Sequence, residues 1–197
     1  MPEGLAPFLL TALALVGSPG PNTLSVAATG AAFGRRRGVA YMVGIVLGML
    51  GVIAIVATGV AGMLLALPGA APVVTVAAAG YFLWLAWRIA TAPPLSDSPA
   101  GPGAAPRWYD GAGLSMVNPK AYAAMAALFS GHVLLAGPLA DAALKTALAL
   151  GVIIPVNIAW LSLGAGLTGL MRDPATSRWI NRAFAAALLI SVAAGLL

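Results

Sequence analysis

Cysteine is absent from the 197 residues, and histidine occurs once, as His132. The lack of cysteine excludes disulfides, thiolate metal ligands and thiol redox chemistry. Charged residues make up only 8% of the chain, against about 25% in an ordinary soluble domain. The acidic residues all lie at predicted loops or helix ends: Glu3, Asp97, Asp110, Asp141 and Asp173. We therefore expect no metal site and no cofactor.

Most of the chain is apolar instead. Hydrophobic residues account for 61% of the sequence and the mean hydropathy is +0.98, whereas a soluble chain needs a polar surface. In such a chain the net charge of +5 reflects how lysine and arginine are distributed between the two sides of a membrane and does not indicate nucleic-acid binding. We expect an integral membrane protein that is surrounded by the lipid bilayer and has no nucleic-acid partner.

The gaps between charged residues predict the membrane spans, because about 20 apolar residues cross a bilayer as a helix. With a turn at LPGAAP, residues 67–72, they predict an all-α fold of six transmembrane helices at about 5–32, 38–66, 72–91, 111–132, 146–171 and 179–197. The proline-rich segment 92–106 predicts a linker outside the membrane. Glu3 stands where a signal peptide has a basic region, so we expect the first span to be retained.

The positive charges predict the orientation of the chain. Eight arginines lie in or beside the connections 1–2, 3–4 and 5–6: Arg35, Arg36, Arg37, Arg88, Arg107, Arg172, Arg178 and Arg182. The opposite side holds Lys145 alone. We therefore expect cytoplasmic arginine-rich loops and two extracytoplasmic termini. A lipid or nucleic-acid patch at GRRRG, residues 34–38, is the alternative.

Each half of the chain, 1–91 and 107–197, then holds three helices. Because three is odd, the second half enters the membrane in the opposite direction, which predicts the inverted repeat of many transporters. The first span contains SPGPN at 18–22, and the matching fourth span contains VNPK at 117–120. Helices interrupted at corresponding places in two halves indicate a binding site near the membrane midplane.

The two breaks have a matching chemistry. Backbone groups freed by proline are tolerated only against protein or a wet cavity. A helix that begins near Asn22 and Thr23 presents N–H groups to a carboxylate, and the end of the preceding helix presents carbonyls to an ammonium. An intramembrane lysine such as Lys120 costs about 2.5–3.5 kcal/mol, so we interpret it as a carboxylate partner in a cavity. Snorkelling of Lys120 and breaks used only for packing are the alternatives.

Other intramembrane residues have two interpretations each. Asn157, beside Pro155, either lines the cavity or makes an interhelical hydrogen bond. Tyr81 either faces the cavity or joins an interfacial aromatic belt. Small residues at Gly44 and Gly48 predict close helix packing, either within one chain or in a homodimer.

Four segments resemble the LysE/RhtB family of amino-acid exporters in order and spacing: SPGPNT at 18–23, GRRRGVAYMVGIVLGML at 34–50, AAAGYFLWLAWRIA at 77–90 and GLSMVNPKAY at 113–122. The resemblance implies a secondary transporter in the bacterial cytoplasmic (inner) membrane that exports amino acids or close derivatives with an ion gradient, the proton being the candidate coupling ion. It implies substrate binding by Pro19, Gly20, Pro21, Asn22, Asn118, Pro119 and Lys120. The run AYAAMAALFSGHV at 121–133 departs from the family's usual Phe-rich pattern, which leaves the substrate's identity open.

An enzyme is not expected. Ser115 and His132 lie on one predicted helix and are about 25 Å apart by helical rise, whereas a Ser–His pair needs about 3 Å. Intramembrane aspartyl proteolysis requires two buried carboxylates, which the sequence does not offer. The alternatives to amino-acid export are export of another small metabolite, a lipid precursor or a cation, and a non-transporting membrane scaffold.

Overall fold

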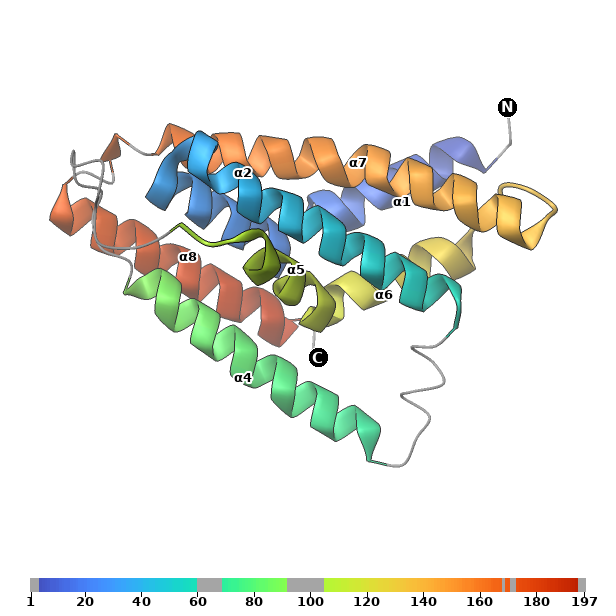
Figure 1. The fold of residues 1–197 in the computed structure, drawn as a ribbon, viewed down its shortest axis with the longest axis horizontal. Coiled ribbons are helices and arrows are strands. Elements are labelled where there is room, and N and C mark those ends of the chain that lie inside the picture. The colour runs from blue at the N-terminus through green and yellow to red at the C-terminus, as the bar shows by residue number, and fades with distance from the viewer. Residues whose placement is uncertain (1–3, 60–68, 92–104, 168, 171–172, 195–197) are drawn as a thin grey trace.

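The computed structural model describes residues 4–59, 69–91, 105–167, 169–170 and 173–194. The elements in these ranges are α-helices packed side by side (Figure 1): α1 Leu5–Gly17, α2 Pro21–Ala57, α4 Ala70–Ala90, α5 Trp108–Val117, α6 Pro119–Gly131, α7 Pro138–Gly166 and α8 Pro174–Ala194. Within the described part of the chain, α2 and α7 are long and apolar enough to cross a membrane, by length and composition.

Both helices that the prolines were expected to interrupt are broken. The predicted span 5–32 is divided into α1 and the start of α2, which begins at Pro21. The predicted span 111–132 is divided into α5 and α6, which begins at Pro119. Each proline occupies a first helical position, where its missing N–H removes no intrahelical bond and its fixed φ suits the helix.

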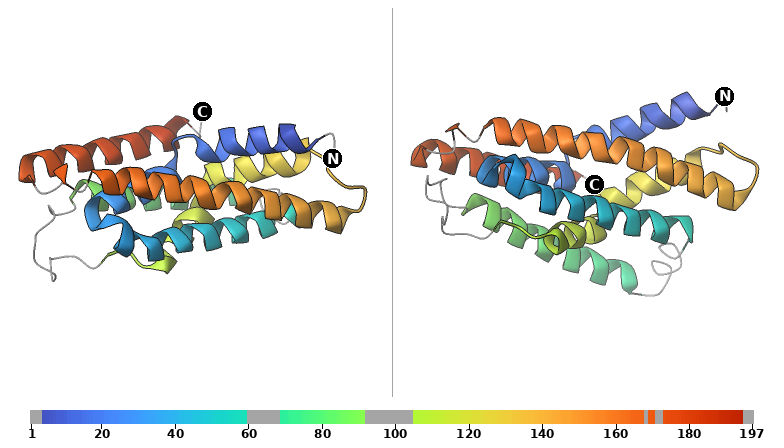
Figure 2. Two further views of the ribbon diagram at one scale, coloured as in Figure 1. Left: turned by 90° about the horizontal axis from the view of Figure 1, so that it is seen from above. Right: turned by 45° about the horizontal axis from the view of Figure 1, so that its top comes forward.

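Glycine at position 34 divides the long helix α2 into two parts. Gly34 has φ 74° and ψ 166°, a conformation that an L side chain rarely adopts. The chain turns back there (Figure 2), so residues 21–33 and 35–57 are separate helical rods. Three exposed arginines, Arg35 to Arg37, follow this turn.

The last two helices begin earlier than the sequence predicts. Helix α7 starts at Pro138 rather than near 146. Lys145, whose charge was expected to mark the helix start, is buried inside the helix and forms an ion pair with Asp141 one turn earlier, at 2.6 Å. Helix α8 starts at Pro174 rather than near 179, where the Thr176 N–H donates to Asp173 Oδ2 at 2.7 Å. The predicted end of the second span near 66 and most of the linker 92–106 lie outside the described residues.

Glycines allow the helices around α2 to touch backbone to backbone. A Cβ at Gly44 would overlap the carbonyl group of Trp108 in α5, and a Cβ at Gly164 in α7 would overlap the carbonyl group of Ala27. Gly48 faces Ala112 of α5 in the same way. The small residues at Gly44 and Gly48 are therefore used for packing inside the chain, which was one of the two interpretations of that pattern.

Candidate functional site

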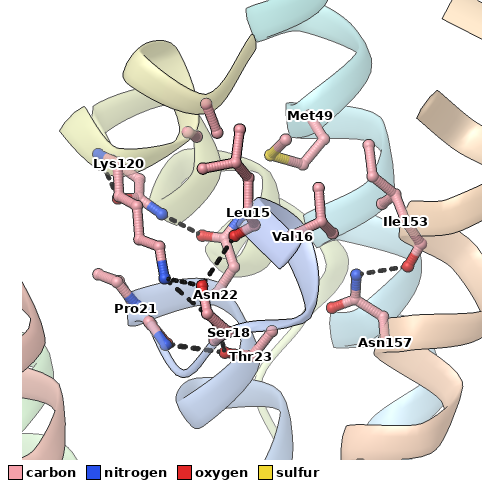
Figure 3. A pocket seen from close by; sticks show the side chains of 14 residues that line it. Leu15, Val16, Ser18, Pro21, Asn22, Thr23, Met49, Lys120, Ile153 and Asn157 are labelled. Carbon is pink, nitrogen blue, oxygen red and sulfur yellow. Dashed lines mark hydrogen bonds between the residues drawn. The ribbon is translucent and has the colours of Figure 1, made fainter. Parts of the chain in front are cut away.

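The two helix breaks meet in the interior of the molecule (Figure 3). Asn118, at the α5–α6 break, donates from Nδ2 to Asn22 Oδ1 at 2.9 Å. Asn22, in the first turn of α2, donates from Nδ2 to Ser115 Oγ at 3.0 Å. The Ser115 hydroxyl in turn donates to the Ile45 carbonyl oxygen at 3.0 Å. A chain of side-chain hydrogen bonds thus joins both breaks to the middle of α2.

Each break also carries a local cap that fits its sequence. At the first break, the Gly20 N–H donates to Thr23 Oγ1 at 2.9 Å. At the second break, the Lys120 N–H donates to Asn118 Oδ1 at 3.1 Å. Such caps satisfy backbone groups that a helix terminus leaves without intrahelical partners. Hydrogen bonds between residues of the same break therefore stabilise the geometry of each break.

Lys120 reaches from the second break to the first. Its Nζ donates to Pro19 O at 2.7 Å, to Ser18 Oγ at 2.9 Å and to Ser18 O at 3.2 Å. A cation is favoured at this point, because the carbonyl end of α1 carries the negative end of the helix dipole. Glycine at position 20 leaves the necessary room, since a Cβ there would lie 2.8 Å from Nζ and 2.9 Å from Cδ of Lys120.

A tryptophan of α7 binds a backbone carbonyl at the end of α1. The Trp160 Nε1–H of α7 donates to the Gly17 carbonyl oxygen at 3.3 Å. In an unbroken helix the donor to this oxygen is the N–H four residues later, but that residue is Pro21, which has none. No pattern in the sequence indicates Trp160 or Ser18 as site residues, because their roles depend on α7 and α6 approaching α1.

A small cavity lies between the breaks and α7, with about 40 Å³ available to the centres of water molecules. Its lining comes from α1, α2, α6, α7 and both breaks: Leu15, Val16, Ser18, Gly20, Pro21, Asn22, Thr23, Met49, Asn118, Lys120, Ala121, Ala124, Ile153 and Asn157. Most of the residues singled out in the sequence, including Thr23 and Asn157, are thus brought together.

Three of the residues singled out do not line the cavity. Pro19 contributes its carbonyl oxygen to Lys120, and Pro119 begins α6. Tyr81 lies away from the cavity: its hydroxyl donates to the Asp110 carbonyl oxygen at 3.2 Å, and its ring centroid lies 5.5 Å from that of Trp84. Of the two interpretations of Tyr81, the cavity position is therefore wrong, because α4 packs this residue against the start of α5.

Asn157 places an unpaired acceptor at the cavity. The residue is 2% exposed, and its Nδ2 donates to Ile153 O at 2.8 Å. Its Oδ1 is buried and has no hydrogen-bond partner among the residues that the structure describes. Exchanging the two amide atoms would point one oxygen at another, so the Ile153 carbonyl defines the orientation. Figure 3 shows the amide oxygen on the side of Asn157 that faces Thr23.

The arrangement does not assemble a Ser–His site from the residues described. Ser115 is engaged by Asn22 and Ile45. His132 lies at the end of α6, with its Nδ1 3.3 Å from Leu128 O and its ring packed on Phe8 at 5.5 Å. No group of three or more His, Cys, Asp or Glu side chains that could hold a metal ion lies within the described ranges. The groups at the two breaks can bind a ligand through amides, hydroxyls, backbone carbonyls and the Lys120 ammonium.

Curated relatives of the chain are efflux proteins. Proteins named cysteine/O-acetylserine efflux protein from Salmonella choleraesuis (strain SC-B67) and Salmonella typhimurium (strain LT2) are 35% identical to it over 113 residues, which cover 57% of this chain and 54% of each relative. The protein of that name from Escherichia coli (strain K12) is 31% identical over 97 residues, or 49% of each chain. The chain spans about half the length of the curated relatives it matches.

The comparison with protein families covers more of the sequence. No solved structure matches the chain with significance. The family description that matches is that of the LysE type translocator, over residues 13–197. This range contains both helix breaks, the hydrogen-bonded asparagines and the whole lining of the cavity. The chain is therefore a helical membrane protein that belongs to the LysE type translocator family.

Proposed function

We propose that this protein is a secondary transporter that exports amino acids or close derivatives across the bacterial cytoplasmic membrane. The observation that carries the proposal is the meeting of two broken helices, from different halves of the chain, around a cavity that contains Lys120. Broken helices at a shared polar cavity are the usual form of a transporter site. Family membership and the names of the curated relatives support this proposal.

The proposed architecture is an inverted repeat of three spans in each half, 1–91 and 107–197. Three features support it. The breaks at Pro21 and Pro119 begin helices at corresponding places. Helix α2 turns at Gly34 into two rods, so the first half supplies spans from 5–33 and from 35–57 before α4. The exposed arginines after Gly34 favour a cytoplasmic position for that turn, with extracytoplasmic termini.

The substrate is proposed to bind as a zwitterion between the breaks. The residues assigned to this site are Pro19, Gly20, Pro21, Asn22, Asn118, Pro119 and Lys120. Carbonyl oxygens at the end of α1 suit an ammonium group, and Lys120 with the N-terminal ends of α2 and α6 suits a carboxylate. Pro21 and Pro119 act through the backbone, by beginning the two helices at the cavity.

The coupling ion is proposed to be the proton, on the resemblance to the family. Lys120 is the charged residue among those that line the cavity, and none of the lining residues is a carboxylate. Among the described lining residues, charge balance therefore depends on Lys120 and on the substrate. A homodimer stays an alternative to a monomer, but its contact would not use Gly44 and Gly48, because α5 covers both glycines within the chain.

Counterflow in proteoliposomes tests the function. Vesicles containing the purified protein and preloaded with unlabelled cysteine, O-acetylserine or serine should accumulate the same amino acid in labelled form, whereas protein-free vesicles should not. Panels of other metabolites, lipid precursors and cations serve as comparison. Counterflow restricted to one of those compounds would replace the amino-acid assignment, and the absence of counterflow for every compound would favour a scaffold.

A further inference from the structure

We propose that the ammonium group of Lys120 occupies, in the empty protein, the position that the substrate's own α-ammonium takes on binding. An entering amino acid would exchange with it: the substrate ammonium takes the oxygens of Ser18 and Pro19, and the released Lys120 takes the substrate carboxylate. The inference rests on the proposed function and deepens it, because it adds that Lys120 and the substrate ammonium compete for the same oxygens, which decides between amino acids and amines.

The first argument is the geometry of the oxygens. Three acceptors, Pro19 O, Ser18 Oγ and Ser18 O, surround one nitrogen at 2.7, 2.9 and 3.2 Å. A primary ammonium has three N–H donors, so this set is complete for one ammonium. The Ser18 hydroxyl donates its proton to Leu15 O at 3.0 Å, which leaves its oxygen free to accept. The three oxygens can therefore bind any R–NH₃⁺ group, whether it belongs to the Lys120 side chain or to a substrate.

The second argument is space. The cavity beside Lys120 offers about 40 Å³ to the centres of water molecules, and a site for a single water needs about 10–15 Å³ on that measure. The cavity therefore has room for a few waters beside the Lys120 side chain. The side chain of Lys120 lines the cavity and is held by hydrogen bonds at its far end. Its withdrawal from the oxygens would enlarge the cavity where the substrate needs room.

The third argument is charge. An amine without a carboxylate would bring a second ammonium beside Lys120, and the lining residues that the structure describes include no acidic side chain to offset it. Like charges a few ångströms apart in a partly buried site repel strongly. A zwitterion brings its own counter-charge for the released lysine. Exchange therefore makes Lys120 a selectivity residue that admits amino acids and rejects the corresponding amines.

Equilibrium binding to the purified full chain tests the exchange with three related probes: cysteine, cysteamine, which lacks the carboxylate, and N-acetylcysteine, which lacks the ammonium. Because the protein has no cysteine, the thiols form no mixed disulfide with it. Wild type should prefer cysteine over cysteamine. In Lys120→Met, cysteamine should bind at least about tenfold more tightly than in wild type, and cysteine at least about tenfold more weakly, each a change of about 1.4 kcal/mol. N-acetylcysteine should bind to neither protein.

Two further variants keep the test decisive. Lys120→Gln keeps a polar, uncharged side chain beside the cavity, so it replaces Lys120→Met if the latter fails to fold, and it should show the same gain for cysteamine. Gly20→Ala, added to either variant, should abolish that gain, because the new Cβ would lie 2.8 Å from the ammonium position. Gly151→Ala is the matched control, since its Cβ would meet nothing within 4 Å.

The outcomes separate the exchange from the proposed function. Cysteamine that binds the Lys120 variants no better than wild type would overturn the exchange, even if wild-type vesicles show cysteine counterflow. A gain for cysteamine that persists in the presence of Gly20→Ala would also overturn it, because the ammonium would then lie elsewhere. Failure of amino-acid counterflow by the wild type, with the cysteamine gain intact, would overturn only the assignment of amino acids as the transported substrates.

Discussion

Asn22 and Asn118 are 96 residues apart in the sequence and share a hydrogen bond of 2.9 Å. Each lies at the start of a helix that follows a break, so the bond joins the two breaks directly. Asn118 uses its Oδ1 at the same time to cap α6 through the Lys120 N–H. One side chain thus fixes both the local geometry of the second break and its contact with the first.

Replacing Asn118 with leucine should remove both functions. Asn22 Oδ1 would lose its donor and the Lys120 N–H its acceptor, and a buried polar group left without a partner costs about 1–3 kcal/mol. We expect at least a tenfold loss of counterflow rate with insertion into the membrane retained. Ser130→Ala is the control, because the Ser130 hydroxyl bonds within its own helix, to Ala126 O at 2.7 Å. Equal counterflow rates for the two variants would contradict the role of Asn118.

Replacing Asn157 with leucine should stabilise the empty protein and weaken substrate binding. The buried Oδ1 has no partner, and such an acceptor costs about 1–3 kcal/mol, which a side chain of similar volume would recover. A donor group on the substrate would satisfy the oxygen in the wild type. We expect a higher unfolding temperature in detergent together with an affinity at least about fivefold lower. A raised temperature with unchanged affinity would show that the substrate does not contact Asn157.

Alanine at position 44 should separate α2 from α5. The added Cβ would overlap the backbone carbonyl of Trp108, which has no alternative rotamer by which to move away. We expect a loss of about 2–3 kcal/mol, within the range for overpacking, and a lower yield of monodisperse protein on size-exclusion chromatography. Gly51→Ala provides the comparison, because its Cβ would meet the flexible side chain of Met116 instead. The two variants should differ clearly in unfolding temperature.

Single cysteines should report the orientation of the chain without background, because the sequence contains none. Arg36 follows the turn at Gly34, and Val133 lies in the connection between α6 and α7 at the opposite end of the molecule (Figure 1), where it is 77% exposed. An impermeant maleimide added to intact cells should label Val133→Cys and leave Arg36→Cys unlabelled. The reverse pattern would invert the proposed topology.

The helix breaks could be predicted from the sequence because proline and glycine act through local sterics. Pro21 and Pro119 begin their helices wherever these helices pack, since the missing N–H and the restriction on the preceding residue belong to the chain itself. The membrane class follows from composition in the same way, because the transfer of apolar side chains from water into lipid does not depend on the fold. Family membership agrees with the membrane class.

The contacts of the site depended on tertiary structure. The partners of the Lys120 ammonium come from residues about a hundred positions earlier, and no periodicity in the sequence indicates which oxygens a long, flexible side chain will reach.

The start of α7 also depends on tertiary structure. The charge of Lys145 predicts a membrane boundary near residue 146, whereas the ion pair with Asp141 allows Lys145 to be buried within the helix. The residue type of Tyr81 allows either a cavity position or an interfacial one, and the packing of α4 places its hydroxyl on the Asp110 carbonyl, away from the cavity. The sequence by itself determined where the helices break and that the chain is a membrane protein, because proline acts locally and the transfer of side chains into lipid is additive. The tertiary structure alone decided which side chains bind the backbone groups at each break, because those contacts depend on distances between segments far apart in the chain.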